Sequence, residues 1–479
     1  MIASIEKVAL PRFDWLRFRS TARRAMPAPA RAWSFGLLAA ACAFNCGALT
    51  VAHAAQQPQP GPAASSAPAA SLNTLQVLHW WTSSSERKAA NALAARMADE
   101  GLEWKDAAIP GGAGLGAGKV LKSRVLAGDA PEVTQIIGVS VAEWAELGLL
   151  LEIDNVASAG NWNGFLFPTI QALIQHRKHV VAAPLGIHRV NTLYYNRALF
   201  AQLKLSPPQT WDEFQSAALK FKAAGIMPLA QSSESWQVAA LFENLVLAES
   251  GPEFYRDLFV RRNPAAAADR RTAEALERLR IVKGWISGQL DERPWPEVVR
   301  QFARREAAMM IMGDWAKPEL AERGMALDED YACGTAPGTG KYHLYSVDTL
   351  TMFAGDYRHM QSQEKMARLL VSPQVQAEFN TLKGAVPVRR DADLSKMDSC
   401  ARVSWTTFAQ GAAVQAPSLV HRMATDEASR DAIIAEIHRY FLDDRATPAE
   451  AQRRLGALFR LFNLRSQGAP GAQDTDRRR

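Results

Sequence analysis

The stretch TLQVLHWWTSSSERKAANALAARMADEG, residues 74–101, contains a strand and then a helix. TLQVLHWW is strand-like, and the apolar residues after Glu86 recur at helical spacing until Gly101. VLKSRVLAGDAPEVTQIIG, residues 120–138, then gives a helix, a glycine-containing turn and a second strand. This alternation predicts an α/β fold, in which helices cover both faces of a parallel or mixed sheet.

A second set of α/β elements follows later in the chain. RVNTLYYN (189–196) is strand-like, and SPPQTWDEF (206–214) is a proline-containing turn that opens a helix. AAMMIMGDW (307–315) and SVDTLTMFAG (346–355) have the composition of buried strands. Because the folded part of the chain has about 400 residues, too many for one hydrophobic core, we expect two lobes. A ligand cleft is expected at their junction, where strand ends and helix N-termini meet.

Residues 1–54 have the pattern of a signal peptide for export to the periplasm. Seven Lys and Arg residues precede or flank the apolar run FGLLAAACAFNCGALTV, and Ala52-His53-Ala54 offers a cleavage site. The alternatives are an uncleaved anchor and a lipoprotein, since Leu38–Cys42 loosely resembles a lipobox. Residues 55–73 are rich in Gln, Pro, Ala and Ser, which predicts a flexible linker.

The charge balance after residue 54 gives no evidence of a strongly basic surface. That N-terminal segment holds seven Lys and Arg against Glu6 and Asp14, so 48 of the 55 basic and 47 of the 49 acidic side chains remain. A chain so close to neutral gives no reason to expect nucleic acid as a partner.

The cysteines indicate an oxidising compartment. Cys333 and Cys400 remain after the signal segment, and an even pair there predicts a disulfide; two separate buried thiols are the alternative. Two cysteines 67 positions apart and scattered histidines predict no metal site, and we expect no cofactor.

Three enzymatic patterns bear on the function class. PGGAGLGAGKV (110–120) fails as a phosphate-binding loop, because Ala113 and Val120 stand where a glycine and a hydroxyl are required. Glycoside hydrolysis needs two carboxyl groups across the scissile bond, and Glu86, Asp314 and Asp348 are candidates. No G-x-S-x-G elbow is present. We expect a binding protein and not an enzyme.

Aromatic and polar residues at the predicted strand ends suit a sugar. A pyranose has an apolar C–H face and a rim of hydroxyls, so its site needs flat aromatic surface beside hydrogen-bonding groups. The residues that offer this mixture are Trp80, Trp81, Glu86, Trp315, Asp348, Lys383 and His421. We expect Trp80 or Trp81 to sandwich the ring with Trp315 while the charged groups and His421 bind hydroxyls.

From Thr74 to about Phe462 the chain resembles the extracytoplasmic solute-binding proteins of family 1, which deliver sugars to ABC importers. AGDAPEVTQI, TLYYNRALFAQLKLSPPQTWDEF and AAMMIMGDW carry this resemblance. VLHWWTSSSE, GIHRVNTLYYN, YACGTAPGT, SVDTLTMF, LKGAVPVRRD and PSLVHRMA make it similar to the glucose/mannose-type periplasmic proteins. The resemblance implies a type II periplasmic binding protein whose two lobes close about a hinge.

The family layout implies specific lobe boundaries. It places residues 74–187 with 346–382 in the N-terminal lobe and residues 188–345 with 383–465 in the C-terminal lobe, and leaves 466–479 as a disordered tail. His188 and Arg189 then lie at the hinge. The implied partners of this monomer are a monosaccharide and the permease subunits of an ABC transporter in the inner membrane.

The resemblance implies that the seven aromatic, charged and imidazole residues named above contact the sugar. Two further positions depart from the family pattern: Ile137 replaces a lysine, and Ser346, a weaker contributor to the site, replaces an asparagine. Loss of a charged donor to a hydroxyl costs roughly 1.5–3 kcal/mol, on the order of ten- to a hundredfold in affinity. The alternatives are therefore a changed or lost sugar ligand, with a sensing or interaction role, and a glycoside-active enzyme.

Overall fold

The computed structural model describes residues 71–111, 114–286, 290–355 and 357–468, all within one compact unit, Pro68–Arg479. The predicted signal peptide, residues 55–70 of the predicted linker and residues 469–479 of the predicted tail lie outside the described residues. Across the described ranges, no helix combines the length and the apolar composition that a membrane span needs.

The first sheet contains β1 Thr74–His79, β2 Glu103–Ala108, β3 Val133–Gln135, β6 Ala183–Arg189, β11 His343–Met352 and β12 Gln415–Pro417. Its strand order is β12-β11-β3-β1-β2, and β6 also pairs with β11. β1 runs parallel to β2 and β3, whereas β11 runs antiparallel to β3 and β6. The sheet is therefore mixed, one of the two alternatives predicted from the sequence.

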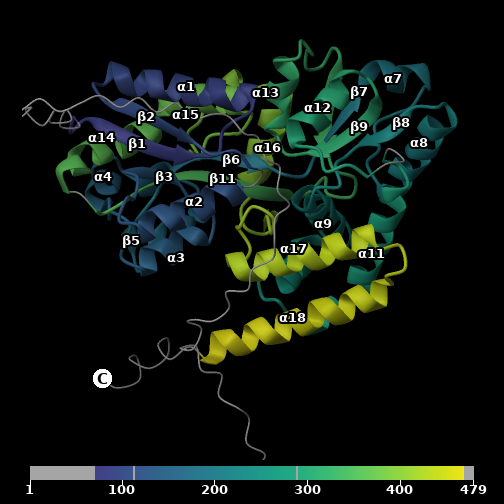
Figure 1. Cartoon of the computed structure of the whole chain (residues 1–479). Coiled ribbons are helices and arrows are strands. Elements are labelled where there is room, and N and C mark those ends of the chain that lie inside the picture. The colour runs from purple at the N-terminus through teal and green to yellow at the C-terminus, as the bar shows by residue number, and fades with distance from the viewer. Residues whose placement is uncertain (1–70, 112–113, 287–289, 356, 469–479) are drawn as a thin grey trace, which may run out of the picture. The chain divides into compact units, whose positions relative to one another are not determined.

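Helices cover this sheet on both sides, as Figure 1 shows for α1 and α15 on one side and α2 and α3 on the other. The helices around the sheet are α1 Ser84–Asp99, α2 Leu115–Leu126, α3 Ser140–Glu146, α4 Asp154–Ala159, α5 Trp162–Phe165, α6 Pro168–Leu173, α14 Met360–Leu370, α15 Pro373–Lys383 and α16 Ser399–Phe408, with the short hairpin of β4 Gln175–His176 and β5 His179–Val180.

The second sheet has the order β10-β7-β9-β8. Its strands are β7 Thr192–Asn196, β8 Met227–Ala230, β9 Ala307–Met312 and β10 Tyr331–Thr335. Its helices are α7 Arg197–Gln202, α8 Trp211–Ala223, α9 Ser235–Phe259, α10 Pro264–Ala268, α11 Arg270–Lys283, α12 Trp295–Ala303, α13 Ala316–Ala321, α17 Glu427–Leu442 and α18 Pro448–Gly468.

Separate clusters of buried apolar side chains define two lobes. Lobe 1 is built on the first sheet and lobe 2 on the second. Along the chain, core membership changes between Ile187 and Val190 and again between Leu344 and Val347. These changes lie close to the predicted hinge positions. That the lobes move about these positions remains a prediction.

One segment belongs to a different core from the one predicted. Val386, Val388, Ala401 and Phe408 pack in lobe 1, although residues 383–465 were assigned to the C-terminal lobe. The reason is a strand bridge between Ile187 and Val386, which keeps the chain on lobe 1 after α15. The chain contributes to the lobe 2 core again from Ala416.

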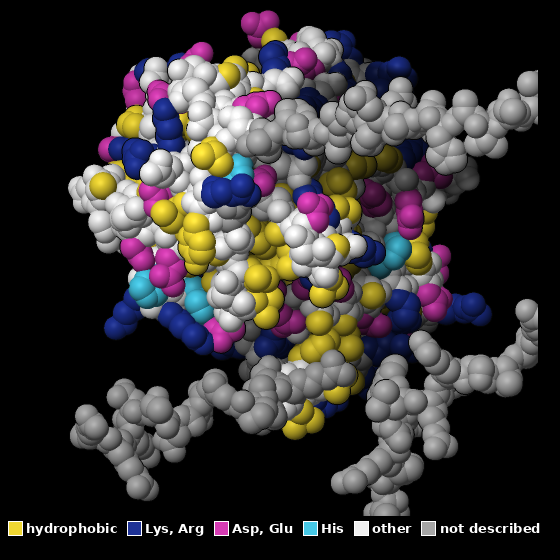
Figure 2. All heavy atoms as spheres, turned by 60° about the vertical axis from the view of Figure 1, so that its left-hand side comes forward, with side chains coloured by type: hydrophobic (Ala, Val, Ile, Leu, Met, Phe, Trp, Pro, Cys, Tyr) yellow, Lys and Arg dark blue, Asp and Glu magenta, His cyan; other side chains and the backbone are white. Residues whose placement is uncertain are grey.

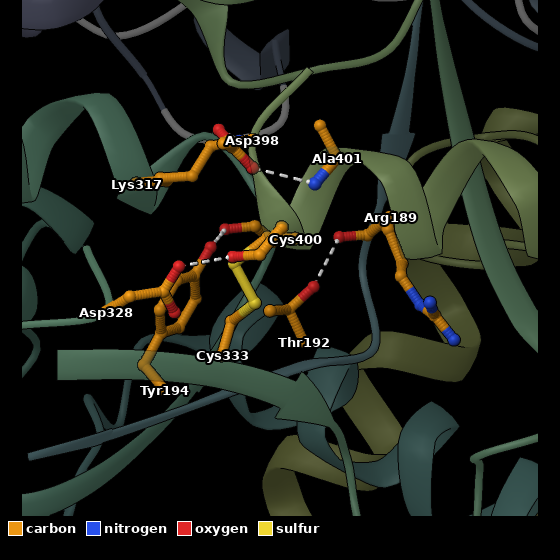
Figure 3. Close-up of a disulfide and its surroundings, with 11 residues drawn as sticks. Arg189, Thr192, Tyr194, Lys317, Asp328, Cys333, Asp398, Cys400 and Ala401 are labelled. Atoms are coloured by element: carbon orange, nitrogen blue, oxygen red, sulfur yellow. Dashed lines mark hydrogen bonds and ion pairs between the residues drawn. A yellow bond between two sulfur atoms is a disulfide. The ribbon is translucent and has the colours of Figure 1, made fainter. Parts of the chain in front are cut away.

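The predicted disulfide between Cys333 and Cys400 is confirmed, with a Cα–Cα distance of 6.0 Å. Cys333 lies in β10 of lobe 2, whereas Cys400 lies in α16, whose apolar side chains pack in lobe 1. Figure 3 shows the bond beside Lys317, Asp328 and Asp398. Lys317 Nζ contacts Asp398 Oδ2 at 2.5 Å, and Ser399 Oγ donates to Asp328 Oδ2 at 2.8 Å. The start of α16 is therefore joined to lobe 2 by covalent and polar contacts.

α18 runs to Gly468, three residues into the tail predicted to be disordered. On the face drawn in Figure 2, Lys and Arg side chains are interspersed with Asp and Glu, in keeping with the near-equal numbers of the two kinds after residue 54.

Candidate functional site

A cavity of about 310 Å³ lies between the lobes. Its lining residues are Trp80, Thr82, Ser83, Glu86, Pro110, Gly111, Ile137, His188, Glu234, Trp236, Pro294, Trp295, Pro296, Trp315, Ser346, Asp348, Lys383 and His421. The candidates Trp80, Glu86, Trp315, Ser346, Asp348, Lys383 and His421 are thus brought together from segments far apart in the sequence. We call Trp80, Glu86, Trp315, Asp348, Lys383 and His421 the inner group.

The tandem tryptophans face different surroundings. Trp80 is partly exposed at the cavity, and its ring lies so close to Gly114 that a Cβ there would come within 2.9 Å of Trp80 Cε3. Trp81 is 1% exposed and packs in the lobe 1 core against Phe379, with ring centroids 5.3 Å apart. The prediction that Trp81 lines the ligand site is therefore corrected, because successive side chains at the end of a strand point to opposite sides.

Glu86 has a structural task besides lining the cavity. It is the third residue of α1 and forms a capping box with Ser83: Ser83 Oγ accepts from Glu86 N–H, and Glu86 Oε2 accepts from Ser83 N–H at 3.2 Å. Its other oxygen, Oε1, accepts from Lys383 Nζ at 3.2 Å. The hydroxyl run of SSSE therefore starts a helix and fixes a carboxylate at the cavity wall.

Lys383 is buried at the end of α15, where the residue is 3% exposed. Gly384 ends this helix at φ +85°, and a Cβ there would lie 2.4 Å from the carbonyl oxygen of Asp314. The close approach of two segments requires glycine at this position. An ammonium group has three N–H donors, so Lys383 retains donors for a ligand besides the one given to Glu86.

A buried histidine lies between two carboxylates. His188 Nδ1 is 2.5 Å from Asp314 Oδ1, and His188 Nε2 is 3.2 Å from Asp348 Oδ2. Burial would lower the pKa of His188, but the charge of Asp314 and the hydrogen bonds to both carboxylates raise it. Both ring nitrogens of the imidazolium can then donate. His188 thus lines the cavity, whereas Arg189 points elsewhere and donates to the carbonyl of Tyr342 at 2.7 Å.

Asp348 is an anionic acceptor at the cavity wall. Burial would raise the pKa of Asp348, but His188, the charge of Lys383 and a hydrogen bond from Gln135 lower it. Gln135 Nε2 donates to Asp348 Oδ1 at 3.0 Å. These contacts fix the orientation of the carboxylate and leave part of its acceptor capacity for a ligand.

His421 is set as an acceptor by the residues behind it. Ser418 Oγ donates to Glu243 Oε1 at 2.8 Å and lies 2.9 Å from His421 Nδ1. Since the hydroxyl proton goes to Glu243, Nδ1 of His421 carries the donor hydrogen. Burial first, and then the charges of Arg430 and His188, lower the pKa of His421 to about 3. The ring is neutral, and its Nε2, which has no hydrogen-bond partner among the described residues, can accept a hydroxyl.

Aromatic rings continue along the lobe 2 wall. Trp315 stands edge-on to His188 at 5.5 Å between centroids and lies 5.1 Å from His421, and Trp236 follows at 6.3 Å from His421. Gly313 makes room for this indole, because a Cβ there would come within 2.2 Å of the Trp315 ring.

The two positions that depart from the family pattern both line the cavity. Ile137 is 1% exposed and presents an apolar surface there. Ser346 pairs with His188 across β11 and β6, and its hydroxyl has no hydrogen-bond partner within the described ranges. This part of the wall therefore offers fewer hydrogen bonds than the family pattern would.

Glu234, Trp236 and Trp295 also line the cavity but were not predicted from the sequence. Glu234 and Trp236 lie about sixty positions before Trp295, and neither segment carries a motif. The single tryptophan between two prolines in ERPWPE was the available signal.

A group of potential metal ligands lies outside the cavity. Glu152, Asp154 and His179 bring ligand atoms within 4.8 Å of one another at the surface of lobe 1. His179 Nδ1 is 2.7 Å from Asp154 Oδ2, which makes this an exposed ion pair as it stands.

A cavity lined by polar and aromatic groups between two α/β lobes is the arrangement expected of a protein that binds a small solute. The chain belongs to the bacterial extracellular solute-binding proteins, whose family model matches residues 81–377. The family resemblance and the predicted fold class, a two-lobed type II periplasmic binding protein, are thereby confirmed.

Relatives and solved structures agree with this assignment. A "Probable sugar-binding periplasmic protein" of Brucella melitensis biotype 1 is 31% identical over 84% of this chain and 92% of its own length. The bacterial solute receptor AcbH, described as exclusive for β-D-galactopyranose, superposes with a TM-score of 0.70 at 15% identity over 81% of this chain and 99% of its own. A chitin oligosaccharide binding protein gives 0.70 at 19% identity over 82% and 100%. At these identities the two solved structures support the fold assignment and nothing about the ligand.

Proposed function

We propose that the protein binds a glucose- or mannose-like pyranose ring in the periplasm and delivers it to the membrane subunits of an ABC importer. The observation that carries this proposal is the convergence of indoles, charged groups and a neutral histidine in one cavity between the lobes. The names of the curated relatives, which are sugar-binding periplasmic proteins, support it.

The proposed roles follow from the hydrogen-bonding state of each group. Trp80 and Trp315 supply apolar surface for the C–H face of the ring. Lys383 donates to hydroxyls, Asp348 and Glu86 accept with their remaining lone pairs, and His421 Nε2 accepts one hydroxyl. Ser346 contributes a weaker contact than an amide would.

Delivery requires an open and a closed state of the lobes. A ligand that touches both lobes binds the closed state better and so shifts the population toward it. Contacts near α1 and α13 support such a closed state: Ser85 N–H and Oγ donate to Glu319 Oε2 at 3.1 and 2.7 Å, and Lys88 pairs with Glu322 at 2.8 Å. We propose that the protein works as a monomer, without cofactor or nucleic acid.

Binding is favoured over glycoside hydrolysis by the state of the carboxylates. A hydrolase needs one carboxyl group that is protonated before it acts. Glu86 is engaged by two backbone N–H groups and Lys383, and the pKa of Asp348 is lowered. Neither arrangement suits a general acid.

The presence of Ile137 in the cavity wall supports a second candidate function. A receptor that has lost a charged donor at this position can have a changed sugar ligand, or serve sensing or interaction without one. The apolar surface of Ile137 beside Asp348 supports a ligand that lacks one hydroxyl there.

The test is a thermal-shift screen over a monosaccharide library with recovery of the sugar. We expect stabilisation by at least one hexose, which is recovered unchanged. The variant Ile137→Lys should raise affinity for glucose by about tenfold, the gain expected from one charged hydrogen bond. Lys396→Met, at an exposed position, is the neutral control. Absence of a shift with every monosaccharide and with every glucose disaccharide would reject the proposed function, and turnover of a chromogenic glycoside that Glu86→Gln abolishes would favour the enzyme.

A further inference from the structure

The cavity wall has further polar and aromatic residues besides the inner group. Glu234, Trp236 and Trp295 line the same cavity, and we call them the outer group. The edge-on contact of Trp236 with His421 joins this part of the wall to the site proposed for the first sugar ring. The outer group is not needed for any contact assigned so far.

Glu234 is fixed in place but keeps a free acceptor. Its Oε2 accepts from Trp236 Nε1 at 2.9 Å and from Gln237 Nε2 at 2.7 Å. Its Oε1 has no partner among the residues that the structure describes. A carboxylate oxygen can accept two hydrogen bonds, so this atom offers a site for ligand hydroxyls. Since the N–H of Trp236 is already used, the rest of that indole offers apolar surface.

Trp295 is the first residue of α12, and its segment is anchored on both sides. Gln237 Nε2 donates to the carbonyl of Arg293 at 2.9 Å, and Arg323 Nη2 donates to the carbonyl of Pro296 at 3.2 Å. Pro294 and Pro296 flank the residue and restrict its backbone. The indole is therefore held before a ligand arrives, which reduces the entropy lost on binding.

The exposure of Trp295 also points to a ligand. Its indole is partly exposed at the cavity and only borders the lobe 2 core. A flat apolar surface beside a free carboxylate oxygen is the combination that a pyranose ring requires, as in the inner group. The outer group thus repeats the chemistry of a sugar site within the same cavity.

We propose that Glu234, Trp236 and Trp295 form a second ring subsite, so that the ligand is a disaccharide or longer oligosaccharide. The inference rests on the proposed function, because the inner group must hold the first ring. The second ring stacks on Trp295 or Trp236 and donates a hydroxyl to Glu234 Oε1.

The test compares monosaccharides and disaccharides by isothermal titration calorimetry on the full mature chain. The probes are glucose, mannose and galactose with glucose disaccharides of α-1,4, β-1,4, β-1,3, α-1,6 and α,α-1,1 linkage. We expect at least one disaccharide to bind about tenfold tighter than its monosaccharide. Trp295→Ala should weaken that disaccharide by about three- to tenfold, the value of one stacking contact, and leave the monosaccharide within twofold.

Matched variants separate the subsite from general damage. Trp295→Phe keeps a flat ring and should retain the disaccharide preference, whereas Glu234→Gln should reduce it by about threefold. Glu292→Gln, at an exposed position that does not line the cavity, should change neither affinity. If monosaccharides bind but no disaccharide binds tighter, the second subsite is rejected and the proposed function stands. If Trp295→Ala weakens both kinds of sugar equally, the subsite is also rejected. If no sugar binds, both proposals fail.

Discussion

Removal of the inter-lobe disulfide should destabilise the protein through its unfolded state. The bond closes a loop between residues 67 positions apart. The chain-entropy relation gives about 4 kcal/mol for a loop of this length at 25 °C, and typical native bonds contribute roughly 2–4 kcal/mol. For Cys333→Ser with Cys400→Ser we therefore expect the free energy of unfolding to fall by about 3 kcal/mol.

The corresponding change in melting temperature is modest. About 400 folded residues have an unfolding entropy of roughly 0.8 kcal/mol/K, so 3 kcal/mol lowers Tm by about 4 °C. Guanidinium unfolding followed by circular dichroism measures the free energy directly. A dithiol reductant should reproduce the loss in the wild type and have no further effect on the double variant.

Because the disulfide joins the two lobes, its removal should also change the cooperativity of unfolding. Because Cys400 lies on a helix that packs in lobe 1 and Cys333 in lobe 2, the double variant should unfold less cooperatively, with the lobes separating as two transitions. A loss below about 1 kcal/mol with an unchanged single transition would refute the reasoning, because it would mean that the contacts of Lys317 and Asp328 alone hold α16 in place.

Three further predictions concern the cavity and the residues behind it. Trp81→Ala should cost roughly 3–5 kcal/mol of stability, measured by chemical denaturation, without changing sugar affinity, whereas Trp80→Ala should lower affinity about tenfold in calorimetry and hardly change stability. Lys383→Met should weaken sugar binding roughly ten- to a hundredfold and destabilise the fold, because Glu86 then keeps a buried charge without its cation. Burial raises the pKa of Glu243 to about 7, despite hydrogen bonds that lower it, so the folded state binds more protons than the unfolded state between pH 4.5 and 7. The free energy of unfolding should fall as pH rises through this window, by up to roughly 3 kcal/mol, and Glu243→Gln should flatten the profile.

The sequence predicted the fold class well because its signals are local. Strand-like and helix-like periodicity depend on a few neighbouring residues, and the large chain size implies separate cores. The membership of Val386 and Phe408 in the lobe 1 core was not predictable in this way, because it depends on a bridge to Ile187, about two hundred positions earlier.

The site was predictable as a set of residues but not as a network. The composition of the segments around Trp80, Trp315 and His421 indicated a binding surface. The pairing of Lys383 with Glu86, and of His188 with Asp314 and Asp348, depends on distances that only the folded chain supplies. The prediction for Trp81 was wrong for the same reason, because neighbouring side chains at the end of a strand point to opposite sides of the sheet.

The capping role of Glu86 has a consequence for selectivity. The Glu86 carboxylate caps the first turn of α1, so it cannot change its rotamer to fit a ligand without destabilising the start of that helix. This side of the site is therefore rigid before the ligand binds. A sugar hydroxyl with the other stereochemistry cannot hydrogen-bond to the fixed carboxylate, so that sugar binds less tightly.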